Sequence, residues 1–166
     1  TPPDAAAPYF DAAFCYNLPH ADTRLSPAKL NLSRFVFPDI RLWDMVSIGI
    51  DPRVLPAEDF RLSLWHGNGL WLKGHSDTWY GEDLLRFARR AREILRKHAA
   101  AFNGDAEPLV ASPHPAVLIN RFSGEGETVY TLFNASYRTA RFTFEGRELV
   151  LAPREVEVVA GGRGQS

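Results

Sequence analysis

The sequence has few features that would assign it at once to a functional class. It has a single cysteine, Cys15, so no disulfide can form within the chain. No apolar run approaches the length that crosses a bilayer, and the opening residues TPPDAAAP have neither the basic start nor the apolar centre of a signal peptide. A formal net charge of -1 gives no basic field for nucleic acid. We therefore expect no membrane and no nucleic-acid partner, and the composition leaves the cellular compartment open.

Signatures of known chemistry are also scarce. The sequence contains no G-x-S-x-G elbow, phosphate loop or dinucleotide fingerprint, so it implies no cofactor. Cys15 and His20 could act as nucleophile and base, but nothing orients the histidine, and a buried structural cysteine is the alternative. His66, His75 and Asp77 are the one cluster of metal-binding residue types, and their spacing matches no recurrent site. We expect no metal.

Methionine is nearly absent as well. The chain begins at Thr1, and its only methionine is the internal Met45. We therefore expect the chain to be a piece of a longer polypeptide. Its 166 residues, 45% of them hydrophobic, are enough to bury a core as one domain or as two small ones.

Three apolar segments precede the middle of the chain. Residues 9–18 (YFDAAFCYNL) are typical of a strand that leads into a proline-containing loop. Residues 39–48 follow Pro38 and show no clean period, and we interpret them as a short helix in a buried connection. Residues 58–65 (EDFRLSLW) alternate apolar and polar side chains, which predicts a strand.

The clearest single element is a helix over residues 82–102. Apolar side chains recur there at intervals of three and four residues and line one helical face. Glu82 and Asp83 lie in the first turn, and Arg96 and Lys97 lie near the last, which complements the helix dipole. Gly104 is placed to end the helix.

The pattern changes after Gly104 to short runs separated by turn residues. Such runs are typical of an antiparallel meander or sandwich. They comprise residues 116–122, 128–134, 139–144, 148–151 and 155–159. We therefore predict two architectures, with residues 1–105 in one domain, residues 106–160 in a small antiparallel β domain, and residues 161–166 as a tail.

The order of these parts carries a family resemblance. Three parts follow one another: the segment RLSLWHGNGLWLKG, the helix GEDLLRFARRAREILRKHAAAF, and a β domain containing TVYTLFN. Together they resemble the C-terminal end of glycoside-hydrolase-type (β/α)8 barrel proteins, including α-galactosidase-like and α-glycosidase-like enzymes. The resemblance implies a mixed α/β plus all-β fold, with the terminal units of a (β/α)8 barrel followed by a small antiparallel β-sandwich. Two such units cannot close a core, so the rest of the barrel is the expected partner, in a longer chain.

The resemblance also implies a carbohydrate substrate and a sugar-binding rim. The loop after a barrel strand faces the active-site mouth, where aromatic rings suit sugar C–H faces and polar side chains bind hydroxyls. The alternative is that the tryptophans fill the core and that Gly67 to Gly69 form an ordinary turn. The predicted substrate-binding residues are His20, Trp43, Trp65, His66, Asn68, Trp71 and Lys73.

Glycoside hydrolysis also needs two carboxyl groups across the scissile bond. Asp44, beside Trp43, is the candidate catalytic residue in this chain, with Asp11 and Asp39 behind it. Proteins of this type usually take the catalytic pair from earlier barrel strands. We therefore expect the chain to contribute part of the binding rim and to be inactive alone.

Two alternatives to this interpretation stay open. The chain could be a non-catalytic carbohydrate-binding or scaffolding module in which the β domain is the working part, although that domain offers only Tyr130, Tyr137 and scattered phenylalanines. It could also belong to a barrel homologue that has lost activity.

Overall fold

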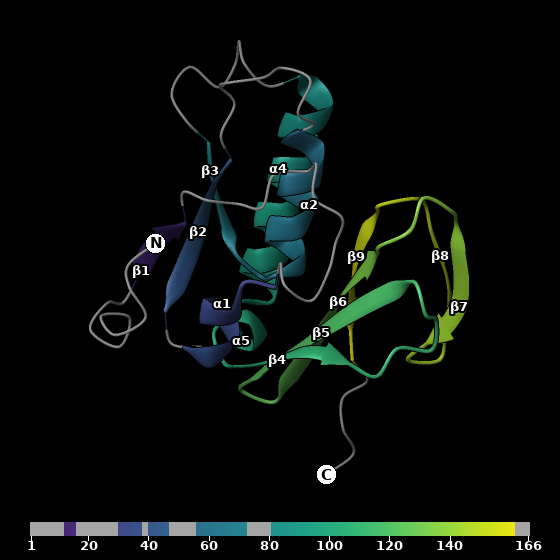
Figure 1. Cartoon of the computed structure of the whole chain (residues 1–166). Coiled ribbons are helices and arrows are strands. Elements are labelled where there is room, and N and C mark those ends of the chain that lie inside the picture. Colours follow the sequence, from purple (N-terminus) through teal and green to yellow (C-terminus); the bar gives the residue numbers. More distant parts are fainter. Residues whose placement is uncertain (1–11, 16–29, 38–39, 47–55, 73–80, 162–166) are drawn as a thin grey trace.

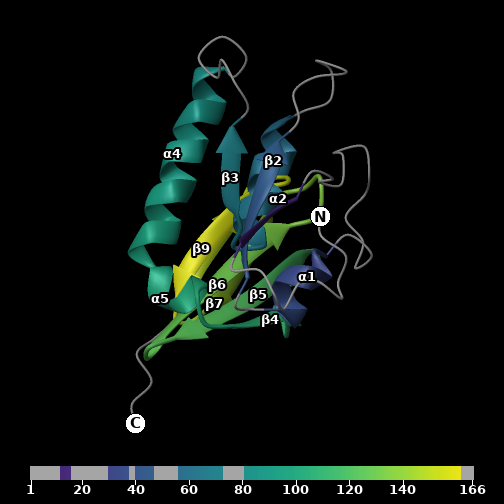
Figure 2. The ribbon, with the colours of Figure 1, turned by 90° about the vertical axis from the view of Figure 1, so that its left-hand side faces the viewer.

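The computed structural model of the protein describes residues 12–15, 30–37, 40–46, 56–72 and 81–161. Parallel strands lie on one side of the molecule, antiparallel strands lie on the other, and helices pack between them (Figure 1). A quarter turn shows the long helix α4 beside the strands β3 and β2 (Figure 2).

The parallel sheet has three strands in the order β1-β2-β3. They are β1 (Ala12–Cys15), β2 (Arg41–Val46) and β3 (Gly69–Leu72). Where residues 9–18 are described, the predicted strand is confirmed. The predicted helix over residues 39–48 is wrong, because β2 occupies its centre. In β2 the buried face carries Asp44 and the partly exposed face carries Trp43, so its sequence lacks the alternation of buried apolar and exposed polar residues that reveals a half-exposed strand.

Helix α2 (Pro56–Trp65) replaces the strand that we predicted over residues 58–65. It packs against the parallel sheet, α4 and the antiparallel strands β6 and β9. Because these neighbours surround it, Leu62, Ser63, Leu64 and Trp65 are all buried in succession. A helix buried on every side needs no single apolar face, so the helical period is lost from its sequence.

The predicted helix over residues 82–102 is confirmed, with one interruption. It forms α4 (Glu82–Lys97) and the short α5 (Ala99–Phe102), and His98 separates the two. Nδ1 of His98 lies 2.7 Å from Oε1 of Glu127, which ties this break to the antiparallel sheet. Among the described residues there is one further helix, α1 (Leu32–Val36).

The five predicted C-terminal strands are confirmed. They belong to a four-stranded antiparallel sheet, in the order β4-β5-β6-β9, and to the separate pair β7-β8. The sequence did not reveal β4, which contains Pro108. The strands are β4 (Asp105–Val110), β5 (Val117–Gly124), β6 (Glu127–Asn134), β7 (Ala140–Phe144), β8 (Arg147–Leu151) and β9 (Val156–Ala160).

The four-stranded sheet has an apolar cluster on each of its faces. One cluster fills the space toward β7 and β8 and makes these strands a β-sandwich; it includes Val117, Ile119, Leu132, Phe142 and Leu151. The clusters on the other face join the sheet to α2, α4 and α5; they include Trp65, Ala91, Phe102, Phe122 and Phe133. The four-stranded sheet therefore contributes to two cores, one shared with β7 and β8 and one shared with the helices.

Candidate functional site

The three parallel strands end at the same edge of their sheet. Cys15, Val46 and Leu72 are their last residues. In open α/β sheets and in barrels, ligands bind beyond these carboxyl ends. The predicted site residues His20 and Lys73 follow two of the strand ends and lie outside the described residues.

Trp43 and Trp71 lie on one face of the parallel sheet. Trp43 is aligned with Gly69 on the neighbouring strand, and Trp71 comes two residues after Gly69, so the side-chain alternation of strands places both rings on the same side. Each residue is 38% exposed, whereas Leu42 and Asp44 on either side of Trp43 are buried. Of the predicted sugar-binding residues that the structure describes, these two keep ring surface available to a ligand.

A glycine sets the position of the Trp43 ring. A Cβ atom at Gly69 would come within 2.2 Å of Cδ1 of Trp43, far inside van der Waals contact. The ring can therefore lie across β3 only because residue 69 has no side chain. The glycines of the segment LWHGNGLWLKG thus have a structural role that the sequence alone did not specify.

The turn at Gly67 corrects the predicted position of the tryptophan-containing loop. We expected this loop to leave a strand at the mouth of a barrel, but it joins the end of α2 to the start of β3. It therefore lies at the amino end of the parallel strand, opposite the carboxyl edge of the sheet. Gly67 has a φ of 69°, and a Cβ there would lie 2.9 Å from Phe102, so the turn is fitted closely against α5.

His66 is buried in this turn rather than exposed to a ligand. Its Nε2 accepts a hydrogen bond from the backbone N–H of Asn31 at 3.1 Å, and its ring packs against Trp65 and Phe35. Burial, with a smaller contribution from the nearby Arg34 charge, lowers the pKa of His66 to about 3. The imidazole is neutral at physiological pH and has no access to a substrate proton.

Asn68 and Asp44 form a buried polar pair beside the same turn. Nδ2 of Asn68 donates to Oδ2 of Asp44 at 3.0 Å, and both residues are at most 1% exposed. A catalytic carboxylate has to reach the scissile bond. Asp44 instead holds the start of β3 to β2, so its placement argues against the catalytic role that we considered for it.

Trp65 connects α2 to the antiparallel sheet. Its Nε1–H donates to the Leu118 carbonyl at 3.2 Å, and its own carbonyl accepts bonds from Asn120 Nδ2 at 3.0 Å and Thr131 Oγ1 at 2.5 Å. The side chain is 1% exposed and packs against Phe133. This corrects the prediction of a sugar-binding role, because the ring has no free surface.

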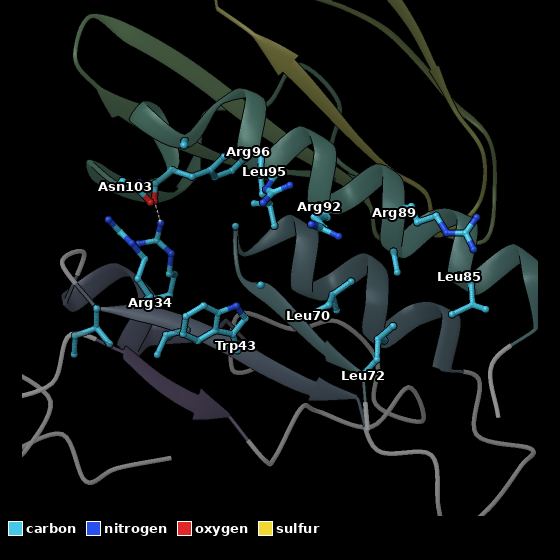
Figure 3. A pocket seen from close by; sticks show the side chains of 18 residues that line it. Arg34, Trp43, Leu70, Leu72, Leu85, Arg89, Arg92, Leu95, Arg96 and Asn103 are labelled. Atoms are coloured by element: carbon cyan, nitrogen blue, oxygen red, sulfur yellow. Dashed lines mark hydrogen bonds between the residues drawn. The ribbon is translucent and has the colours of Figure 1, made fainter. Parts of the chain in front are cut away.

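A cavity of about 700 Å³ lies between the edge strand β3 and helix α4 (Figure 3). Leu70, Leu72, Leu85 and Leu95 give it apolar walls. Five arginines also line it, and none of its lining residues within the described ranges is acidic; they are Arg34, Arg41, Arg89, Arg92 and Arg96. We did not identify this arginine cluster from the sequence, although the spacing of Arg89, Arg92 and Arg96 along one helical face was visible.

The described part of the chain has neither a metal-binding cluster nor a membrane-spanning helix. No group of three or more His, Cys, Asp or Glu side chains is placed to hold a metal ion there, and His75 and Asp77 of the considered cluster lie outside it. None of the described helices combines the length and the apolar character that crossing a membrane requires.

Comparison with known proteins shows similarity in structure only. No protein-family model matches the sequence, and no curated protein is similar to it. A maltogenic amylase from S. marinus superposes on 97% of this chain with a TM-score of 0.61 and 13% identity, and the match covers 30% of that enzyme. The cyclic α-maltosyl-(1→6)-maltose hydrolase of Arthrobacter globiformis matches 81% of this chain and 39% of its own, with a TM-score of 0.55 and 14% identity.

The debranching enzyme of Nostoc punctiforme gives a similar result. It matches 74% of this chain and 34% of its own length, with a TM-score of 0.52 and 13% identity. The chain thus spans between 30 and 39% of these three glycoside hydrolases. The resemblance that we predicted from the sequence is confirmed at the level of the fold.

Proposed function

We propose that the chain is the C-terminal portion of a longer glycoside-hydrolase-like protein that acts on carbohydrate. In this proposal residues 1–105 supply the last β/α units of a (β/α)8 barrel, and residues 106–160 form the β domain that follows it. The observation that carries the proposal is the order of parts: a parallel β2-α2-β3 unit, then α4, then an antiparallel sandwich, matched over most of the chain by glycoside hydrolases.

The proposed contribution of this chain is a pair of aromatic rings at the sugar site. Trp71 is the penultimate residue of β3, close to the carboxyl edge of the sheet, and Trp43 lies on the same face. Flat rings stack on the apolar faces of sugars. The described buried carboxylates, Asp44 and Glu58, are bonded to Asn68 and Arg154, so we assign the catalytic pair to strands that precede this chain.

The test uses the longer natural protein with maltotriose as the probe, because one neighbouring structure, AmyP, holds that sugar. Trp71→Ala should raise KM for maltotriose about tenfold and lower the melting temperature less than Trp65→Ala does, since its ring is partly exposed. The matched control is Trp65→Ala, which should lower the melting temperature instead. An unchanged KM in Trp71→Ala, together with a lowered melting temperature, would assign this ring to structure.

A second measurement tests the length of the native protein. An antibody against α4 should detect in the source a polypeptide several times heavier than 18.6 kDa. A band at 18.6 kDa would contradict the proposal and favour a small carbohydrate-binding or scaffolding module.

A further inference from the structure

The turn between β6 and β7 carries the most exposed aromatic side chain of the described residues. Tyr137 is 77% exposed, whereas Trp43 and Trp71 are each 38% exposed. Its neighbours in sequence, Ser136 and Arg138, are polar. The ring therefore lies largely outside the core of the sandwich, as a single aromatic surface among polar residues.

A buried asparagine holds this turn in one conformation. Asn134 is 0% exposed, and its Nδ2 donates to the carbonyls of Arg138 and Ala152 at 2.7 and 2.9 Å. Its Oδ1 accepts hydrogen bonds from the backbone N–H and the hydroxyl of Ser136 at 3.0 and 2.8 Å. The residues on both sides of Tyr137 are thus bonded to one buried side chain, which fixes the backbone that carries the ring.

The guanidinium of Arg154 fixes the orientation of the ring. Cζ of Arg154 lies over the Tyr137 ring, 5.4 Å from its centroid, and over the buried Phe133 ring at 4.9 Å. Arg154 in turn bonds the Glu58 carboxylate and the Ala135 carbonyl. Its backbone φ of 58° is one that a non-glycine residue keeps only where its surroundings hold it. A fixed cation thus occupies one face of the tyrosine ring, and the exposed surface is the opposite face and the edge.

The same arginine places the ring at the carboxyl end of the parallel sheet. Phe60 of α2 packs against Leu72, the last residue of β3, and Glu58 comes two residues before Phe60. Because α2 turns back directly into β3, its first turn lies at the end where the parallel strands finish. Arg154 bonds Glu58 there, and β9, which follows Arg154, runs opposite to β3 (Figure 2). Tyr137 therefore lies at the end of the molecule where ligands of α/β sheets and barrels bind.

We infer that Tyr137 is a second contact for carbohydrate, which binds a sugar chain that extends beyond the site beside Trp71. The flat ring stacks on the apolar face of a sugar unit, and the exposed Arg138 and Thr139 beside it offer donors for hydroxyl groups. A protein partner suits the place less well, because the core of a protein interface needs several adjoining apolar residues. This inference rests on the proposed function, and it adds that the substrate is a polymeric carbohydrate.

The first experiment compares a short and a long sugar in the longer natural protein. Tyr137→Ala should raise KM for amylose about threefold to tenfold and change KM for maltotriose less than about twofold, because only the long chain reaches the sandwich. The matched control is Tyr137→Phe, which keeps the ring and should leave both KM values within about twofold of those of the unaltered protein. Both variants should leave the melting temperature nearly unchanged, since the side chain is largely exposed.

The second experiment detects the contact without using activity. Tetranitromethane nitrates exposed tyrosines of the longer protein, and mass spectrometry measures the nitrated fraction of the peptide that carries residue 137. Amylose should lower this fraction at least about threefold, because a stacked sugar covers the ring, whereas polyethylene glycol at the same mass concentration should not. Tyr130 is the internal control, since its half-buried ring packs against Phe144 and its nitration should not respond to amylose.

The outcomes separate this inference from the proposed function. Equal changes in KM for the two sugars in Tyr137→Ala, or nitration of Tyr137 that amylose does not reduce, would overturn the second contact and leave the barrel proposal standing. A native polypeptide of 18.6 kDa would overturn the barrel proposal, while the nitration experiment would still decide whether the ring of Tyr137 binds sugar.

Discussion

The two sheets that flank α2 differ in how completely they are covered. The antiparallel sheet β4-β5-β6-β9 has the β7-β8 pair on one face and the helices on the other. The parallel sheet is covered by helices on one face, whereas Trp43 and Trp71 on the other are partly exposed and β3 ends the sheet beside an open cavity.

The two sides also differ in how some of their buried polar atoms are bonded. On the antiparallel side, buried polar atoms such as those of Asn134 and Thr131 are bonded to backbone carbonyls within the chain. On the parallel side, Nη1 of Arg34 is buried without a hydrogen-bond partner among the described residues. We therefore expect the largest stability losses from substitutions at the joint between α2 and the antiparallel sheet, and smaller ones on the exposed face of the parallel sheet.

The largest expected effect compares the two kinds of tryptophan. Trp65→Ala should lower the free energy of unfolding by about 4 to 5 kcal/mol, because it removes a buried ring together with a hydrogen bond to Leu118. Trp71→Ala should cost about 2 kcal/mol, clearly less than Trp65→Ala, since its side chain is 38% exposed. Urea unfolding followed by circular dichroism measures both. Similar costs for the two variants would mean that the parallel sheet is as tightly packed as the joint with the sandwich.

The next prediction concerns the ion pair between α2 and the turn before β9. Arg154 bonds Glu58 and the Ala135 carbonyl and stacks on Phe133. Because both charged groups are nearly buried, Glu58→Ala should destabilise the chain by about 3 kcal/mol and leave a buried cation.

Asp83→Ala provides the control for this pair. It breaks the exposed ion pair with Arg86 and should cost less than about 0.5 kcal/mol. If Glu58→Ala cost no more than Asp83→Ala, α2 would be fixed to the sandwich by apolar contacts alone.

The same contrast explains which parts of the fold the sequence predicted. Helix α4 and the pair β7-β8 each have one covered face and one more exposed face, so their periods are visible, and the strands of the four-stranded sheet are short runs bounded by turn residues; these predictions were confirmed. Helix α2 lies inside the molecule, and strand β2 carries Trp43 on its partly exposed face and Asp44 on its buried face. Their apolar residues follow the positions of neighbours rather than a period, and the sequence led us to exchange strand for helix at both places.

The site was less predictable than the fold, for a related reason. Sequence composition identified an unusual segment around Trp65 and Trp71, but it could not show that one ring is buried against Phe133 while the other is partly exposed. The arginine cluster was missed because Arg89 and Arg92 occupy the polar face of an amphipathic helix, where charged residues are ordinary. Only the structure shows that these arginines line a cavity together with residues of β3.

The pH dependence of stability should reveal the buried turn between α2 and β3. The pKa of His66 is about 3 in the folded chain and about 6.5 when unfolded, so the unfolded state binds more protons between these values. Stability contributed by neutral His66 is therefore present above pH 6.5 and is lost as the pH falls toward 3. The loss should be about 2 kcal/mol at pH 5. His66→Gln should remove this component from the pH dependence of urea unfolding, and an unchanged curve would show that the ring is accessible to protons.

The smallest expected effect tests how rigidly the exposed tryptophan face is fixed. A methyl group at residue 69 would overlap Cδ1 of Trp43, so Gly69→Ala should cost about 1 to 2 kcal/mol and displace the indole, with a change in tryptophan fluorescence. The cost should lie toward the low end for overpacking, because a partly exposed ring can move aside. Gly81→Ala is the control, since a Cβ there meets no atom within 4 Å. If Gly69→Ala left the fluorescence unchanged, the ring would already occupy other positions, and Trp43 could not serve as a preorganised surface for sugar.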